Sequence, residues 1–438
     1  MNEQNLQHEP ILALDIGTTK VIAIAGRRNE HGKLEVLGVG VVPSEGVMRG
    51  VVTNIEKTSR AIQAAVNEAS RQADMTFHQA HVGIAGQHIK SIRQPGMVTR
   101  ENTLTEISQA DIDRLIQDMN KMVLPPGEKI LHVLPQEYTV DGEQGILDPI
   151  GMSGVRLEGT FTIITGQQTS FNNIGKCVER AGLKVASLTL EPIASATAVL
   201  SDEEKEAGIA LVDMGGGTTD VIIYCDGIVR HTAVIPFGGE IITKDIKEGC
   251  LVMKDQAEKL KVKFGSALAE EVFDNRIITI PGLKGRPPKE IAEKNLARII
   301  QARVEEILDL VVWEINRSGH GNKLIGGIVL TGGGSLLNHI DKLTEFHTGK
   351  PCRIGLPIEQ LAHGYSERLC SPLFSTAIGL LLKGLDDLEA GRIRPYKAAP
   401  EPEKEPEKED AEEENGNLLS NLLRKTKEWF EAAPDVEF

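Results

Sequence analysis

The sequence predicts an α/β protein made of two related lobes, and three observations lead to this prediction. A strand–turn–strand segment at Ile11–Ile22 recurs 198 positions later at Leu211–Ile222. A third apolar run, Gly327–Leu330, leads directly into a glycine-rich turn. Apolar residues at helical spacing, as in Ile55–Ala73, lie between such strand-like runs. Alternating strands and helices of this kind are typical of α/β proteins, and the repeat indicates duplicated lobes.

Short runs rich in β-branched residues open the first lobe. We expect strands at Ile11–Leu14, Val21–Ala25 and Leu34–Val42, because turn residues bound each run. Ile55–Ala73 has the apolar spacing of an amphipathic helix, and His81–Ala85 is again a strand-like run. These elements predict one sheet with a helix packed on it.

The stretch 91–165 has a different pattern of apolar runs and turns from the segments around it. It contains several short strand-like runs, one expected helix near Ser108–Met122, and turns at Pro125–Gly127 and Asp148–Pro149. We therefore expect a small subdomain inserted into the first lobe.

The second half repeats the alternation of strands and helices. We expect a strand–turn–strand unit at Gly208–Tyr224, helices at Lys244–Gly265 and Pro288–Asn316, a buried strand at Gly327–Leu330 that opens a helix, and a final helix at Leu373–Leu388. This half predicts a second lobe related to the first.

Two segments after position 396 differ in composition and apolar pattern from the rest of the chain. Residues 397–416 hold nine acidic and three basic residues, so −6 of the formal net charge of −15 lies there. Such a stretch cannot build a core, and we expect a disordered acidic linker. Asn417–Ala433 regains helical periodicity, with its apolar residues inside an arc of about 140° and basic residues outside it.

That pattern is typical of an amphipathic helix lying at a membrane surface. A helix that docks on the body or on a partner is the alternative, and the tether-like linker favours the membrane. The residues expected to contact lipid are Leu418, Leu419, Leu422, Leu423, Lys425, Lys427, Trp429 and Phe430.

The bulk composition excludes several classes of protein. A net charge of −15 makes the chain a poor match for nucleic acid. The five cysteines form no CxxC pair and no His cluster accompanies them, which argues against a zinc site or a disulfide framework. No apolar run approaches the roughly 20 residues that span a bilayer, and the polar N-terminus lacks the apolar core of a signal peptide. We expect a cytosolic body.

The two repeats have the chemistry of a phosphate-binding site. In each, an aspartate (Asp15 or Asp213) ends a buried strand and a Gly-Thr-Thr turn follows. Glycines let the backbone approach a phosphate, and successive N–H groups with threonine hydroxyls form an anion-binding nest. A carboxylate beside such a nest implies a bridging cation, and Mg²⁺ held through one or two carboxylates and several waters meets that need.

Each motif alone could be an ordinary hairpin turn, but three in this order favour a nucleotide site. No GxxxxGK[ST], GxGxxG, GxSxG or HExxH motif offers a rival chemistry. The candidate phosphate-binding residues are Gly17, Thr18, Thr19, Lys20, Gly215, Gly216, Gly217, Thr218 and Thr219. The candidate base and ribose contacts are Gly332, Gly333, Gly334 and Ser335, with Gly238 and Gly239 as a further contact.

These motifs resemble the two phosphate motifs and the adenosine motif of the actin/Hsp70/hexokinase superfamily. Within it, the chain is most similar to the FtsA family of bacterial cell-division proteins. LALDIGTTKVIAI, HVGIAG, LEPIASATAVL, PFGGE and AEKLKVKFG carry this resemblance, which covers roughly residues 10–388.

The resemblance implies an actin-like two-lobed ATPase fold with duplicated five-stranded sheets and an inserted 1C subdomain. It implies that Asp15 and Asp213 organise Mg²⁺ and the attacking water, that Glu191 polarises that water, and that Glu258 and Lys261 contact ribose or adenine. A helix-start charge for Glu191 and a solvated face for the other two are the alternatives. The implied division is 9–86, 166–196 and 371–396 for subdomain 1A, 87–165 for 1C, 197–238 and 305–370 for 2A, and 239–304 for 2B.

The resemblance also implies a function and partners. FtsA-like proteins bind ATP, form actin-like filaments of themselves on inner-membrane lipid, tether the FtsZ ring and recruit later division proteins. The FtsZ tail would dock on subdomain 2B, where Arg303 and Arg298 are candidate contacts. Hydrolysis of ATP would be slow and serve as a switch.

Three other functions of the superfamily fit the sequence less well. A small-molecule kinase would need a catalytic aspartate in a sugar pocket, which nothing in the sequence indicates. An Hsp70-like chaperone would need a large β-rich domain after the ATPase. A PilM-type pilus adaptor would not be expected to carry the linker and the final helix. The FtsA-like division protein is therefore the favoured prediction.

Overall fold

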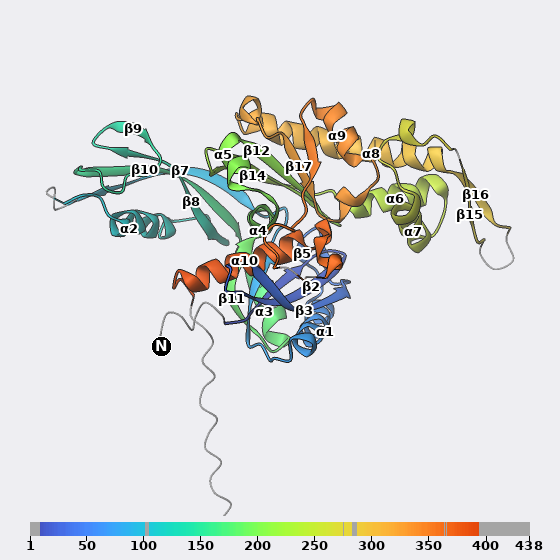
Figure 1. Ribbon diagram of the computed structural model, residues 1–438, viewed down its shortest axis with the longest axis horizontal. Helices are drawn as coiled ribbons and strands as arrows, with labels where there is room; N and C mark the ends of the chain where they lie inside the picture. Colours follow the sequence, from blue (N-terminus) through green and yellow to red (C-terminus); the bar gives the residue numbers. More distant parts are fainter. Residues whose placement is uncertain are drawn as a thin grey trace, which may run out of the picture. The chain divides into compact units, whose positions relative to one another are not determined.

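The computed structural model describes residues 9–100, 105–274, 276–282, 287–362, 364 and 366–393 (Figure 1). They belong to a single unit that ends at Arg394. The predicted linker at 397–416 and the predicted helix at 417–433 lie outside the described residues. In the part that is described, no helix combines the length and apolar character needed to cross a membrane.

The first lobe is built on a five-stranded sheet with the order β11-β6-β1-β2-β3. Its strands are β1 (Ile11–Ile16), β2 (Lys20–Arg28), β3 (Leu34–Pro43), β6 (Gln79–Ile84) and β11 (Lys184–Leu190). β1 and β2 form an antiparallel hairpin, whereas β6 pairs in parallel with both β1 and β11. The short strands β4 (Val47–Met48) and β5 (Val51–Val52) form a separate hairpin.

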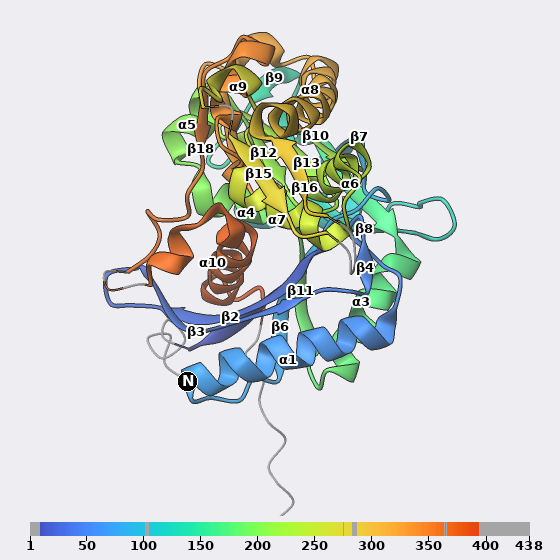
Figure 2. The same cartoon turned by 90° about the vertical axis from the view of Figure 1, so that its right-hand side faces the viewer.

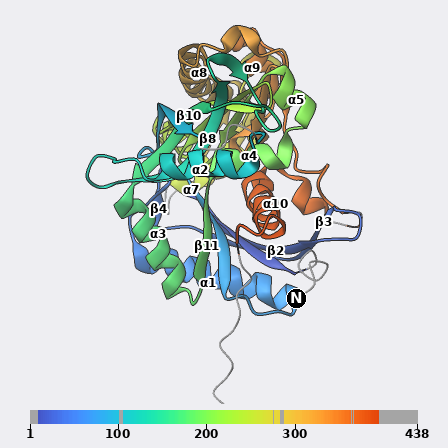
Figure 3. The ribbon, with the colours of Figure 1, turned by 90° about the vertical axis from the view of Figure 1, so that its left-hand side faces the viewer.

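Helices cover both faces of this sheet. α1 (Ile55–Ala73) and α3 (Gln168–Arg180) lie on one face, and α10 (Ser375–Glu389) lies on the other with α4 (Glu191–Val199) against it (Figures 2 and 3). Alternate residues of β1 therefore enter different cores: Leu12 packs toward α1 and Ala13 toward α10. This two-sided burial explains why the strands read as continuous apolar runs.

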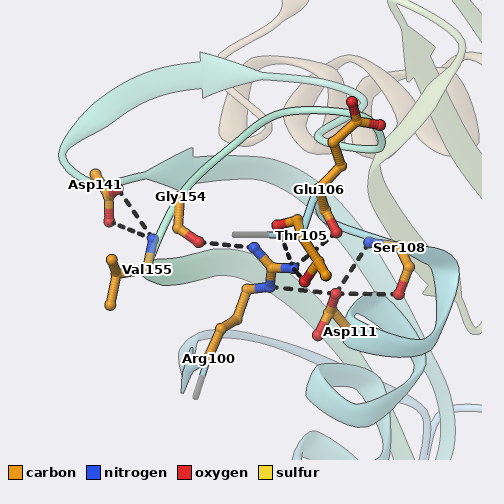
Figure 4. Close-up of polar contacts among 8 residues, drawn as sticks. All are labelled: Arg100, Thr105, Glu106, Ser108, Asp111, Asp141, Gly154 and Val155. Carbon is orange, nitrogen blue, oxygen red and sulfur yellow. Dashed lines mark hydrogen bonds and ion pairs between the residues drawn. The ribbon is translucent and has the colours of Figure 1, made fainter. Parts of the chain in front are cut away.

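The inserted subdomain is a four-stranded antiparallel sheet with one helix. The order is β7-β10-β8-β9, with β7 (Lys90–Thr99), α2 (Gln109–Asn120), β8 (Glu128–Val140), β9 (Glu143–Ile146) and β10 (Arg156–Gln167). The buried guanidinium of Arg100 donates to the carbonyls of Gly154, Thr105 and Glu106 and forms an ion pair with Asp111, which joins the sheet to the start of α2 (Figure 4).

The second lobe repeats the five-stranded plan with the order β14-β13-β12-β17-β18. Its strands are β12 (Ile209–Met214), β13 (Thr219–Cys225), β14 (Ile228–Ile235), β17 (Ile328–Thr331) and β18 (Cys352–Ile354). The remaining elements are α5 (Asp202–Ala207), α6 (Gly239–Cys250), α7 (Lys254–Phe264), β15 (Ile277–Ile280), β16 (Lys289–Ala292), α8 (Glu293–Arg317) and α9 (Ile340–Thr348). The duplicated five-stranded sheets and the inserted subdomain confirm the predicted fold class.

Three expected helices of the second lobe were wrong in detail. The single helix at 244–265 is two helices, because α6 ends at Cys250 and Leu251 adopts a left-handed φ of 50°. The helix at 288–316 begins only at Glu293, since β16 before it pairs with β15 and buries Ile291. The glycine run after β17 opens a short 3₁₀ turn, Gly333–Leu336, and not an α-helix.

Candidate functional site

The two repeated turns have matching geometry. The Gly17 N–H donates to the Lys20 carbonyl at 3.0 Å, and the Gly215 N–H donates to the Thr218 carbonyl at 2.9 Å. The turns also approach each other closely: a Cβ placed on Gly216 would lie 2.4 Å from Cγ2 of Thr19. Glycine is therefore required where the two lobes meet.

A cavity of about 330 Å³ lies between these turns. Of the residues predicted to form the site, those that line it are Asp15, Gly17, Thr18, Thr19, Lys20, Glu191, Asp213, Gly215, Gly216, Gly217, Thr218, Gly239, Glu258, Lys261, Gly332, Gly333 and Gly334. The structure thus brings together residues that are more than 300 positions apart in the chain.

Three predicted contacts do not line the cavity. Thr219 is buried and its hydroxyl donates to the Phe237 carbonyl at 2.8 Å. The Ser335 hydroxyl donates to the Gly332 carbonyl at 2.7 Å and so closes the 3₁₀ turn. A Cβ on Gly238 would lie 2.6 Å from the Gly215 carbonyl oxygen, so this glycine permits a close backbone approach behind the wall.

Four carboxylates gather at the cavity in a buried setting. Burial raises the pKa of Asp15 to about 6, with Lys20 opposing and Asp213 adding to the shift. Burial also raises the pKa of Asp213, which Ser195, Thr376 and Lys20 counteract. Glu191 has its pKa raised well above the ordinary value by burial and by the neighbouring aspartates. Such a cluster favours a bound cation or bound protons.

The fourth carboxylate, Asp220, was not among the predicted site residues. Burial and then Asp213 raise its pKa to about 8, while the Thr218 hydroxyl donates to it at 3.1 Å. Its Oδ1 is buried and has no hydrogen-bond partner among the described residues. In the sequence Asp220 follows the Gly-Thr-Thr of the second repeat, and in the structure it pairs with Asp213 across the hairpin as Ile22 pairs with Asp15.

Two further polar residues were not among the predicted site residues, although Ser195 lies in the segment LEPIASATAVL that carries the family resemblance. Ser195 on α4 donates its hydroxyl hydrogen to Asp213 Oδ2 at 2.6 Å, and Thr376 on α10 donates to the same oxygen at 3.2 Å. These donors stabilise the ionised form of Asp213. Lys20 lies nearby, and its Nζ donates to the Leu373 carbonyl at 2.7 Å.

The donor set fits Mg²⁺ better than a metal held by protein alone. In the described ranges, no group of three or more His, Cys, Asp or Glu side chains is arranged to hold a metal ion. Mg²⁺ usually keeps several waters and uses one or two carboxylates together with phosphate oxygens. Asp15 and Asp213, beside the glycine–threonine turns, offer such carboxylates.

Glu258 and Lys261 reach the cavity from α7. The Lys261 Nζ donates to the Gly239 carbonyl at 2.9 Å and to the Thr243 hydroxyl at 2.8 Å, and it pairs with Glu258 at 2.8 Å. The lysine thus ties α7 to the start of α6. Val262, also on α7, lines the cavity as well.

The two candidate partner-binding arginines lie apart from the cavity on α8. Arg303 is already paired with Asp245 of α6 and with Glu306 of its own helix. Arg298 is exposed, and its guanidinium donates to Asn295 at 3.4 Å. An acidic peptide would therefore find Arg298 accessible but would have to compete with Asp245 for Arg303.

Comparison with known proteins identifies relatives over nearly the whole chain. A family profile described as cell division protein FtsA matches residues 210–379, and one for the SHS2 domain inserted in FtsA matches residues 86–165. The FtsA of Pseudomonas aeruginosa is 41% identical over 87% of this chain and 90% of its own length. That of Neisseria meningitidis is 41% identical over 97% and 99%, and that of Escherichia coli is 35% identical over 85% and 90%.

Solved structures with the same fold are more distant in sequence. The PilM-PilN type IV pilus biogenesis complex contains a chain that is 16% identical, with a TM-score of 0.61 over 86% of this chain and 98% of that one. MreB5 of Spiroplasma citri bound to ADP is 16% identical, with a TM-score of 0.55 over 88% and 98%. They show the actin-like fold. With the matching relatives, the inserted domain and the duplicated sheets in place, the chain belongs to the FtsA family of cell division proteins.

Proposed function

We propose that the chain binds ATP with Mg²⁺ in the cavity between its lobes. The observation that carries this proposal is the pair of matching glycine–threonine turns that face each other across buried aspartates. The turns offer backbone N–H groups and hydroxyls to phosphate oxygens. The structural relative MreB5, solved with ADP, supports a nucleotide as the ligand.

Each group has a defined role in this proposal. Asp15 and Asp213 hold Mg²⁺, directly or through water, and Lys20 offsets phosphate charge. Mg²⁺ supplies charge neutralisation for the phosphates when it is bound. Glu191 orients a water, and burial and the neighbouring aspartates raise its pKa. Hydrolysis is slow and acts as a switch, and Glu258 and Lys261 border the ribose and base.

Binding and turnover can be tested separately. We expect fluorescent ATP to bind the full chain with Mg²⁺, and Lys20→Ala to weaken binding because a charge that faces the phosphates is lost. Glu191→Gln should keep affinity and lose turnover, since the amide keeps the shape but not the charge. If Lys20→Ala binds ATP as tightly as the unsubstituted protein does, the site assignment is contradicted.

Membership of the FtsA family supports a role in cell division beyond nucleotide binding. In our proposal the chain polymerises into actin-like filaments at the cytoplasmic face of the membrane, tethers the FtsZ ring there through the FtsZ tail, and recruits later division proteins. The helix at 417–433 is the anchor, and the segment 239–304 with Arg298 and Arg303 receives the tail. One short amphipathic helix binds lipid weakly, so several copies on one filament supply the avidity.

Liposome co-sedimentation with ATP and Mg²⁺ tests the tether. We expect the full chain to pellet with lipid, and a chain ending at Gly416 and the Trp429→Glu variant to stay in the supernatant. Arg424→Gln, a change outside the apolar arc, is the matched control and should pellet. Addition of FtsZ then tests recruitment. If all variants pellet alike, lipid binding lies elsewhere and the tether assignment fails.

A further inference from the structure

A second recess lies where the inserted subdomain meets the second lobe, apart from the nucleotide cavity. β7 and β14 are edge strands of their sheets, and they lie side by side (Figure 1), with the Ser91 hydroxyl donating to the Thr232 carbonyl at 3.3 Å. These strands and the last turn of α8 enclose a recess of about 630 Å³. That volume is in the range of small-molecule sites.

Several polar atoms in this recess are buried without a partner. The hydroxyls of Thr162 and Thr232 and the Nε of Arg230 make no hydrogen bond within the described part of the chain. Thr162 is 3% exposed and Thr232 is 6% exposed. A buried polar group without a partner is costly, so natural proteins usually satisfy it with protein, water or ligand. All three groups can donate a hydrogen bond, so an acceptor-rich occupant would satisfy them.

The charge of the recess favours an anion over water alone. Its lining holds four basic side chains, Lys90, Arg93, Arg230 and Arg317, and one acidic side chain, Glu314. Glu314 is occupied, because His231 Nε2 lies 2.7 Å and Arg317 Nη1 3.4 Å from its carboxylate oxygens. Lys90 pairs with Glu128, and Arg230 with Asp226.

Arg93 is the exception among these cations. No carboxylate of the described residues lies within ion-pair distance of it. Burial, followed by the positive charges of Arg230, Lys323 and Arg93, lowers the pKa of His320, with Asp226 opposing. An exposed arginine in a positive field attracts an anion of matching shape.

We propose that this recess binds a small soluble ligand that carries a phosphoryl group. Arginine forks and threonine hydroxyls supply the several donors that a tetrahedral phosphoryl anion accepts. Arg93 and Thr162 come from the inserted subdomain, whereas Arg230, Thr232 and Arg317 come from the second lobe. The ligand therefore bridges the two parts and fixes the inserted subdomain against the second lobe.

Calorimetric titration of the full chain with inorganic phosphate at constant ionic strength tests this proposal. We expect saturable binding that Arg93→Gln and Thr162→Val each weaken at least about tenfold, because each removes a donor to a charged group. Arg156→Gln is the matched control, since Arg156 lies on β10 but pairs with Glu158 outside the recess. Lys20→Ala should leave phosphate binding here unchanged, which separates this recess from the nucleotide cavity.

Three results would overturn the proposal. Absence of saturable binding would mean that water fills the recess. Equal phosphate affinity in the full chain and in both recess variants would place the anion elsewhere, and loss of binding in Lys20→Ala alone would place it in the nucleotide cavity. Acetate that binds as tightly as phosphate would show a site for carboxylates. None of these results would contradict the proposal for ATP.

Discussion

His132 connects the inserted subdomain to the candidate catalytic glutamate, and its protonation should destabilise the protein. The residue lies on β8, and its Nε2 accepts the N–H of Leu190 at 3.0 Å, one residue before Glu191. Burial, and to a smaller degree Lys383, lowers the pKa of His132 from 6.5 to about 4, with Asp387 opposing. The ring is therefore neutral in the folded protein and accepts a hydrogen bond that a protonated ring could not accept.

The size of the effect follows from the two pKa values. In the unfolded chain His132 binds a proton near pH 6.5, whereas in the folded protein the ring is protonated only near pH 4. Stability is therefore complete above about pH 6.5 and is lost as the pH falls below it. A difference of about 2.5 pKa units corresponds to about 3.4 kcal/mol at full protonation, and to about 2 kcal/mol at about pH 5.

Comparison with His132→Gln isolates this contribution, because the amide oxygen keeps an acceptor but does not titrate. Between about pH 7.5 and pH 5, we expect the free energy of unfolding of the unsubstituted protein to fall by about 2 kcal/mol more than that of His132→Gln. Urea unfolding gives the difference, and the ring signals of His132 in NMR give the pKa directly. His31→Gln, at an exposed position, is the control. Parallel stability curves, or a His132 ring that titrates near 6.5, would refute the reasoning.

Three further substitutions test the site and the packing. Ser195→Ala removes the donor to Asp213 Oδ2, which should raise the pKa of Asp213 and weaken Mg²⁺-dependent ATP binding about tenfold in a fluorescence titration, with Ser201→Ala as control. Arg100→Lys should cost about 3 kcal/mol because the three carbonyls that the buried Arg100 guanidinium binds lose that donor (Figure 4). Thermal unfolding and proteolysis of the inserted subdomain measure it, and Arg156→Lys should be neutral. Gly379→Ala would bring a Cβ to 1.7 Å from the Ala194 carbonyl oxygen, and we expect it to lower the free energy of unfolding in urea by about 3 kcal/mol. Gly175→Ala on α3 is the control, because the space around Gly175 is open, and it should be neutral or stabilising. Unchanged stability in Arg100→Lys or Gly379→Ala, or unchanged Mg²⁺ dependence in Ser195→Ala, would contradict the contacts described.

Much of the architecture could be predicted because the local apolar spacing and turn signals agree with the positions of the buried strands and helices. α1 spans Ile55–Ala73 as expected, since its apolar spacing, the Asn54 cap and the left-handed Asp74 all mark the same boundaries. The duplicated turns predicted both lobes and most of the cavity wall. The failures in the second lobe have tertiary causes: Ile291 joins a two-stranded sheet, and no local signal distinguishes that strand from the helix that follows it.

Ser195 and Thr376 were missed for one physical reason. Each reaches Asp213 because α4 and α10 pack closely at Gly379. Such contacts depend on how two helices cross, which sequence spacing does not specify. Asp220 is different, because it directly follows the Gly-Thr-Thr of the second repeat and pairs with Asp213 across the hairpin, a position that Ile22 occupies in the first repeat.

The buried carboxylates link the stability of the protein to the contents of the cavity. Asp15, Asp213 and Asp220 are buried and Glu191 is partly buried, and burial is the first cause of the raised pKa of each. Lys20 is the cation that interacts with Asp15 and Asp213, and burial lowers its own pKa. Without a bound cation, the protein therefore loses stability as the pH rises and these groups ionise, and a bound cation that stabilises their ionised forms restores that stability. Under the proposal for ATP, these charges favour a phosphate ligand that arrives with its cation, because phosphate alone would add to the repulsion.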